Sequence, residues 1–211
     1  MLVGESDAGK EAMPRSEELR LIARAKRGSA EAFRALVDEY KDRLFAFVWR
    51  MIRDHHDAED ICQAAFVRAY EALDSYSERY AFSTWLFTIA YRLCVNQLRK
   101  RRALSGEVDF SRMGTGEADA PQAVANTEEA RRLKTLIWSA VDKLSPPQKS
   151  SVMLFYREGK SCEEIGQVLE MPTVTVKSHL HRARAKLRTA LRSELVDDWM
   201  AIQFLGDSRY A

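Results

Sequence analysis

Cysteine is scarce in this chain of 211 residues, which contains three. Cys62, Cys94 and Cys162 are far apart along the chain. An odd number of widely spaced thiols fits neither a disulfide framework nor a zinc site, because both need clustered cysteines. We expect all three to be small, buried or half-buried side chains in a protein of a reducing compartment.

Long apolar runs are also absent. A membrane-spanning helix needs about 18 or more consecutive apolar residues, and a signal peptide needs an apolar segment near the N-terminus. The sequence has neither, so we expect a soluble, cytoplasmic protein without membrane insertion. The alternation of apolar and polar residues that marks strands is missing too, as are hairpin turns and internal repeats. The prediction is an all-α fold.

The chain has little net charge, +2, but the charge is unevenly distributed. Residues 92–102 and 177–192 contain basic side chains and no acidic ones. Between them, residues 104–125 contain Glu107, Asp109, Glu117 and Asp119 against Arg112 alone. Two basic surfaces are therefore predicted on either side of an acidic connector.

Residues 161–187 carry the most informative pattern, two helices joined by a tight turn. Ser161 and Glu164 form a capping box, Pro172 ends the turn, and Thr173 can cap the second helix. The apolar residues of that helix form one stripe that we expect to pack inward: Val176, Leu180, Ala183 and Leu187. At about 100° per residue, the opposite face holds Lys177, Ser178, His181, Arg182 and Arg188, with Arg184 and Lys186 on its flanks.

An outer face without acidic residues suits a helix that lies between two phosphate backbones. The alternative is an ordinary solvated face of an amphipathic helix. Because the caps, the turn, the inward stripe and the basic face all agree, we interpret residues 161–187 as a DNA-binding helix-turn-helix.

The remaining segments predict two small helical domains joined by a flexible linker. In the first domain, helices are expected over residues 17–26, from Ser29 for about five turns, from an N-cap at Asp57, and over 82–98. In the second, Thr127 is an expected N-cap, and Ser145 with Gln148 a capping box for a helix over 146–157. The expected boundaries are a disordered tail over 1–15, a first domain over 16–103, a flexible acidic linker over 104–126, a second domain over 127–194, and a C-terminal extension over 195–211.

Aromatic residues gather where a polar loop, residues 74–81, enters the helix that starts at residue 82. Tyr76, Tyr80, Phe82 and Trp85 are close together, about four turns before the basic run of that helix. Rings near basic side chains suit single-stranded nucleic acid, since bases stack on the rings while Arg and Lys hold phosphates. The alternative is that Phe82 and Trp85 anchor the helix in the core, and for Trp85 alone the two interpretations are about equally good.

Together these features resemble bacterial sigma factors of the extracytoplasmic-function type. The resemblance covers residues 30–191 apart from the linker and rests on three stretches in the family's order. Residues 57–73, DAEDICQAAFVRAYEAL, resemble the helix that docks on the clamp coiled coil of core RNA polymerase. Residues 82–102, FSTWLFTIAYRLCVNQLRKRR, resemble the minus-ten segment, and residues 144–187 the minus-thirty-five domain.

The resemblance implies an initiation subunit that binds core RNA polymerase and promoter DNA, catalyses nothing, and needs no cofactor or metal. It also implies an anti-sigma protein as a partner. The implied polymerase contacts are Asp57, Asp60, Gln63 and Phe66, although capping and dipole compensation are an alternative for both aspartates. The implied minus-ten binding and melting residues are Tyr76, Tyr80, Phe82, Ser83, Thr84, Trp85, Asn96 and Arg99. The implied minus-thirty-five residues are Thr173, Thr175, Lys177, Ser178, His181, Arg182 and Arg184.

Two positions depart from the commonest family pattern. Val174 replaces a frequent glycine, and His179 stands where arginine is frequent, which removes one possible phosphate or base contact. The acidic linker resembles one that threads a polymerase channel, and a solvated tether fits it equally well. The C-terminal extension is apolar enough, with Trp199, Ile202 and Phe204, to pack on a domain or a partner.

Two other functions can be weighed against this one. The TVKSHL pattern at 175–180 also occurs in response regulators and quorum-type activators, but the strands of a receiver or sensor domain are missing. A metalloenzyme would need residues 55–60, with two histidines and three acidic residues, to converge on one ion. Neighbouring helix positions diverge by about 100°, so a turn and an N-cap are favoured there.

Overall fold

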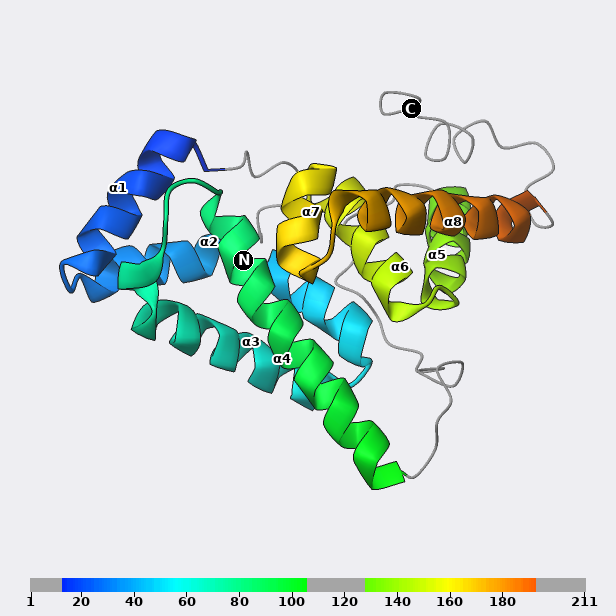
Figure 1. The fold of residues 1–211 in the computed structure, drawn as a ribbon, viewed down its shortest axis with the longest axis horizontal. Coiled ribbons are helices and arrows are strands. Elements are labelled where there is room, and N and C mark those ends of the chain that lie inside the picture. The colour runs from blue at the N-terminus through cyan, green and yellow to red at the C-terminus, as the bar shows by residue number, and fades with distance from the viewer. Residues whose placement is uncertain (1–12, 106–127, 193–211) are drawn as a thin grey trace, which may run out of the picture. The chain divides into compact units, whose positions relative to one another are not determined.

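The computed structural model describes residues 13–105 and 128–192, and within them every regular element is helical (Figure 1). The helices fall into two compact units. The structure therefore confirms the predicted all-α fold with two small helical domains. The first unit contains α1 (Arg15–Lys26), α2 (Ala30–Ile52), α3 (His55–Glu71), the 3-10 turn η1 (Leu73–Ser75) and α4 (Phe82–Ser105). The second contains α5 (Glu128–Asp142), α6 (Pro146–Val152), the π-helical turn η2 (Met153–Arg157), α7 (Cys162–Leu169) and α8 (Thr173–Arg192).

Helix α2 is the centre of the first unit, because α1, α3 and α4 all pack against it. Its apolar face is fully buried at Leu44 and Val48, and the ring of Phe47 lies 5.2 Å from that of Phe87 on α4.

Cys62 and Cys94 are buried free thiols and Cys162 is half-buried, as expected. Among the described helices, none is long and apolar enough to cross a membrane.

The helix starts correct several sequence expectations. Ser29 does cap α2, since its Oγ accepts from the Ala32 N–H at 3.3 Å. Helix α3, however, is capped by Asp54, whose carboxylate accepts from the Asp57 N–H at 2.9 Å, so the expected cap at Asp57 is wrong. Thr173 does not cap α8 either. It is the first residue of that helix, because the carbonyl of Pro172 accepts from the Thr175 N–H at 2.9 Å.

The helix lengths differ from expectation in three places. Helix α1 begins at Arg15, inside the expected tail. Helix α4 continues through the basic run to Ser105. The helix expected over 146–157 becomes α6 followed by the π turn η2. The expected cap at Thr127, most of the linker, the first twelve residues and the C-terminal extension lie outside the described residues.

The helix-turn-helix has the predicted form. The Ser161 N–H donates to Glu164 Oε2 at 3.0 Å and the Glu164 N–H donates to Ser161 Oγ at 3.2 Å, which completes the capping box. Along α8 the predicted stripe is buried, with exposures of at most 2% at Val176, Leu180, Ala183 and Leu187. Gly166 of α7 allows the turn to come close, because a Cβ there would lie 2.9 Å from the Met171 carbonyl oxygen.

Gly166→Ala should therefore destabilise the helix-turn-helix by about 1–3 kcal/mol, the usual cost of overpacking a close contact. The direction of the change in stability is informative, because a glycine-to-alanine change on an open helix face stabilises by about 0.5–1 kcal/mol. Urea unfolding of the full chain would measure the effect, with Gln167→Ala on the exposed face of α7 as the control. A stabilised Gly166→Ala variant would contradict the close contact.

Candidate nucleic-acid interface

The outer face of α8 presents three of the predicted minus-thirty-five side chains to solvent. Lys177, His181 and Arg182 are exposed, and Ser178 is half-buried beside them. Arg182 Nη2 donates to Ser178 Oγ at 2.7 Å, so the guanidinium is held along the helix surface. No acidic side chain interrupts α8, which leaves a continuous positive face above the buried stripe.

The first turn of α8 holds the two predicted threonines. Thr173 and Thr175 are half-buried, and Val174 between them is 78% exposed. The backbone amides of a helix N-terminus carry partial positive charge and favour anions such as phosphate. Val174, which stands where glycine is frequent in the family, is therefore exposed at the N-terminal end of α8. This is the end of the helix that favours a phosphate.

Arg184 differs from the other basic residues of α8, because it turns toward its own domain. Its Nε donates to the Tyr156 hydroxyl at 2.8 Å, and its guanidinium lies 5.4 Å from the centre of the Phe155 ring. Both aromatic residues belong to η2. Arg184 thus connects α8 to the π turn η2. A helical wheel cannot show this contact, because it gives the direction of a side chain and not what lies opposite it.

His179 also differs from an outward cation. Its Nδ1 is buried and has no hydrogen-bond partner among the described residues. Burial lowers the pKa of His179, and the nearby positive charge of Arg182 lowers it further. An imidazole with a lowered pKa is uncharged at neutral pH, so this position does not supply the positive charge of the arginine that is frequent there.

In the first unit, the structure brings three of the four predicted aromatic rings into contact. The Tyr76 ring lies 5.4 Å from Trp85 and 5.7 Å from Phe82, and Phe82 lies 5.7 Å from Trp85. Phe82 is fully buried and Tyr76 is 4% exposed, whereas Tyr80 and Trp85 are half-buried. The cluster therefore has three rings, two buried and that of Trp85 half-buried, and Tyr80 is tied to it through its backbone carbonyl, which accepts from the Tyr76 hydroxyl at 2.7 Å.

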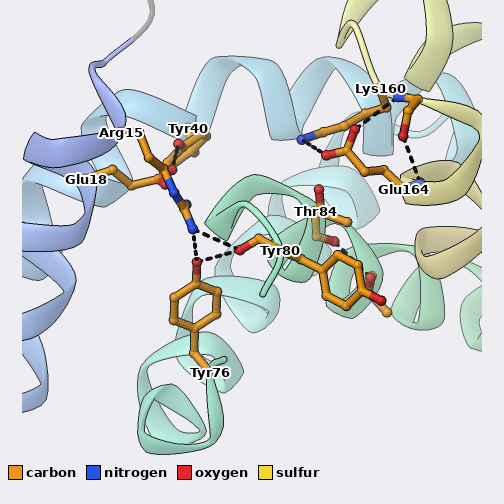
Figure 2. A network of polar contacts seen from close by, with 10 residues as sticks. Arg15, Glu18, Tyr40, Tyr76, Tyr80, Thr84, Lys160 and Glu164 are labelled. Carbon is orange, nitrogen blue, oxygen red and sulfur yellow. Dashed lines mark hydrogen bonds and ion pairs between the residues drawn. The ribbon is translucent and has the colours of Figure 1, made fainter. Parts of the chain in front are cut away.

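The other predicted minus-ten residues follow along α4. Ser83 and Thr84 are buried in its first turn, and Asn96 and Arg99 are exposed three turns or more beyond. Sequence reasoning missed Arg15 and Lys26 of α1, which donate hydrogen bonds to the loop between η1 and α4. Figure 2 shows Arg15 beside Tyr76 and Tyr80 of that loop. The sequence predicts Arg15 to lie in a disordered tail. Its partners Tyr76 and Tyr80 lie 61 and 65 positions further along the chain, so no local pattern connects them to Arg15.

The residues predicted to contact polymerase separate into two kinds. Asp60 and Gln63 are exposed on α3 and Phe66 is half-buried. Asp57 instead points to α4, where its carboxylate accepts from Gln97 Nε2 at 2.8 Å and from Arg101 Nη2. These interactions lower the pKa of Asp57, first through Gln97 and then through Arg101, against an opposing effect of burial.

The same helix start was weighed as a metal cluster. His55 Nδ1 lies 3.6 Å from Glu59 Oε1 along the helix, while Asp57 turns to α4. Within residues 13–105 and 128–192, no group of three or more His, Cys, Asp or Glu side chains is placed to hold a metal ion. Asp57 thus acts as a contact between α3 and α4.

Comparison with known proteins decides the family. The family models Sigma-70 region 2 and Sigma-70, region 4 match residues 36–104 and 134–187. The chain is 35% identical over 181 residues to the ECF RNA polymerase sigma factor SigW of Bacillus subtilis, which covers 81% of this chain and 95% of the relative. The chain belongs to the extracytoplasmic-function (ECF) sigma factors.

Further comparisons agree with this assignment. This ECF sigma factor is 32% identical over 170 residues to the ECF RNA polymerase sigma-E factor of Escherichia coli K12, covering 78% of this chain and 88% of the relative. Among solved structures, CnrH in complex with the cytosolic domain of CnrY matches with a TM-score of 0.61 and 26% identity, over 84% of this chain and 98% of that one. The sigma factor RpoE of Bartonella quintana, solved with the anti-sigma factor NepR, shares the fold with a TM-score of 0.65 at 24% identity, over 77% of this chain and 98% of that one. The sigma factor therefore acts in transcription initiation, and its family regulates transcription and is not a class of enzymes.

Asp57→Asn should lower the free energy of unfolding at pH 7 by about 0.5–1 kcal/mol, the range for a partly exposed ion pair. Since the folded-state pKa of Asp57 is lowered, the stabilisation is complete above the unfolded pKa of about 4. It disappears as pH falls through the folded-state pKa. Urea unfolding of both proteins over a series of pH values would measure this, with Glu71→Gln on the exposed end of α3 as control. A difference that grows on acidification would contradict the assignment.

Proposed function

We propose that this ECF sigma factor binds core RNA polymerase through α3, reads a minus-thirty-five element with α8, and captures unpaired minus-ten bases at the loop before α4. The observation that carries the proposal is the outer face of α8, where exposed basic residues lie opposite a buried apolar stripe on a helix that contains no acidic residue. The domain boundaries, including the linker over 104–126, remain predictions and are part of this proposal.

The face of α8 has the chemistry for duplex DNA. A helix fits the major groove, where lysine or arginine donates to the O6 and N7 acceptors of guanine, and each good contact discriminates by about 1–3 kcal/mol. We assign base reading to Lys177, Ser178, His181 and Arg182, and phosphate contacts to Thr173 and Thr175 at the helix N-terminus. Arg184 was predicted as a DNA contact. Its bond to Tyr156 supports a narrower role, which is to hold α8 at its angle on the domain.

The loop and the start of α4 have the chemistry for unpaired bases. Tyr80 and Trp85 are half-buried and can stack on bases, and the buried rings of Tyr76 and Phe82 pack against Trp85. Ser83 and Thr84 follow in the first turn of α4, and we assign them to minus-ten binding because this segment resembles the minus-ten segment of the family. Asn96 and Arg99 are exposed further along α4 and would face the upstream duplex. Unstacking a base costs a few kcal/mol, which stacking and polymerase contacts must offset.

The exposed side of α3 supports polymerase binding. Asp60 and Gln63 project to solvent, and Val67 is 56% and Tyr70 47% exposed on the same helix. A carboxylate and an amide beside exposed apolar groups suit a partner surface that is basic and partly apolar, as proposed for the clamp coiled coil. Phe66 adds apolar contact, and Asp57 contributes by fastening α3 to α4. An anti-sigma protein is a further proposed partner, by extension from relatives solved in complexes.

Transcription with purified core RNA polymerase tests the whole proposal. The template is genomic DNA from the source organism, including the region upstream of the protein's own coding sequence, and transcript 5′ ends are mapped with and without the protein. New start sites that share spaced upstream elements are expected. The absence of new transcripts, together with tight binding of the free protein to duplex DNA, would instead support an activator.

The double variant Lys177→Ala, Arg182→Ala should abolish selection of those start sites, because two cationic contacts to the minus-thirty-five element are lost. Binding to core polymerase should not change, since neither residue lies on α3. Mapped transcripts and co-purification with core polymerase measure the two properties. Arg132→Ala on α5 with Lys143→Ala just after its end, both exposed, removes the same charge elsewhere. Equal loss of promoter selection in that control would contradict the role of α8.

A further inference from the structure

Helix α1 is joined to the loop between η1 and α4 by one arginine (Figure 2). Arg15 Nη2 lies 3.1 Å from the Glu78 carbonyl oxygen, 3.2 Å from the Tyr80 carbonyl oxygen and 3.3 Å from the Tyr76 hydroxyl. A planar guanidinium has several donors in a rigid arrangement, so it can hold more than one acceptor at once. The loop is thereby attached to the start of α1.

The position of Arg15 is itself determined by a buried carboxylate. Glu18 is 4% exposed, pairs with Arg15 Nη1 and accepts from the hydroxyl of Tyr40 on α2. Burial and the hydrogen bond to Glu18 raise the pKa of Tyr40, so its hydroxyl keeps the proton it donates. Figure 2 shows this order, from Tyr40 through Glu18 and Arg15 to the loop tyrosines.

A second anchor lies at the other end of α1. Lys26 Nζ donates to the Tyr76 carbonyl oxygen at 3.1 Å and lies 5.8 Å from the centre of the Tyr76 ring. Within the loop, the Tyr76 hydroxyl donates to the Tyr80 carbonyl oxygen at 2.7 Å. Both ends of the segment from Tyr76 to Tyr80 are therefore fixed to the same helix.

This attachment acts on the proposed base-capture site. Tyr76 is in ring contact with Trp85 and Phe82, and Tyr80 is the last anchored residue before α4 begins. A loop that already has its binding conformation loses less conformational freedom when a base enters, so capture is more favourable. We infer that Arg15 and Lys26 are positioning residues for minus-ten opening and that α1 holds the capture loop in its binding conformation. The inference rests on the proposed function of that loop.

Anchoring of the loop can be separated from stability of the fold. Helix α1 packs on the domain through buried Ile22 and Ala25, whereas the Arg15 side chain is 41% exposed. Lys26→Ala leaves the pair of Arg15 with buried Glu18 intact, so it separates anchoring from stability directly. Arg15→Ala removes the ion-pair partner of Glu18, so it should also lower the stability of the fold.

The experiment measures open-complex formation by holoenzyme at a promoter mapped as above, with wild type, Arg15→Ala, Lys26→Ala and Arg20→Ala. Arg20 is the matched control, because it is an exposed arginine of α1 whose Nε donates at 3.4 Å to Ser16 of the same helix. Rates at several holoenzyme concentrations give the initial binding constant and the isomerisation rate constant separately. Thermal unfolding of each free protein is measured alongside.

Arg15→Ala should lower the isomerisation rate constant about tenfold, the effect of losing hydrogen bonds from one charged donor. Initial binding should match that of Arg20→Ala in both variants. The unfolding temperature should match that of Arg20→Ala for Lys26→Ala, and should fall for Arg15→Ala because Glu18 loses its ion-pair partner. Lys26→Ala should affect the same rate constant to a smaller extent, since it removes one bond, and it provides the test if Arg15→Ala folds poorly.

Isomerisation rate constants equal to that of Arg20→Ala in both variants would overturn the inference. A loss confined to initial binding would overturn it as well. Failure of wild-type holoenzyme to form any open complex would count against the proposed function, and is distinguishable because it precedes any comparison of variants.

Discussion

The buried carboxylate of Glu18 is the constraint on which the arrangement of the first unit depends. A buried charge is costly unless it is paired and hydrogen-bonded, and here Arg15 and the Tyr40 hydroxyl meet that need. Because these partners come from α1 and α2, the carboxylate determines how α1 lies on the central helix. The same pairing aims the guanidinium at the loop, so a requirement of folding also decides the conformation of the loop before α4.

Basic residues that look alike in sequence have different tasks in the structure. Arg182 lies on an exposed helix face, whereas Arg184 bonds to Tyr156 and Arg101 pairs with Asp57. A helical wheel gives the direction of a side chain about its own axis but not what another element places opposite it. The proposed DNA-binding surface of α8 is thus smaller than its charge count suggests, because Arg184 contacts Tyr156 and Phe155 of η2 instead.

Features that depend on nearby residues were predictable from the sequence. The capping box at Ser161, the buried stripe from Val176 to Leu187 and the all-helical fold all follow from spacings of a few residues. The missed features depend on distant partners: Arg15 bonds a loop 61 to 65 residues away, and Asp57 pairs across 44 residues. Burial of Phe82 and Tyr76 belongs to this second kind, because exposure of a ring is decided by tertiary packing.

In the proposed function, the two units would recognise DNA by different physics. The α8 face would offer exposed charges to a duplex, so its affinity would come largely from counterion release and fall steeply with salt. The loop at α4 offers rings and a backbone already held by Arg15 and Lys26, and stacking on rings depends little on ionic strength. Duplex binding and strand capture then respond to separate conditions. Because α1 holds the backbone of the loop before α4, it would influence promoter opening without contacting the duplex that α8 reads.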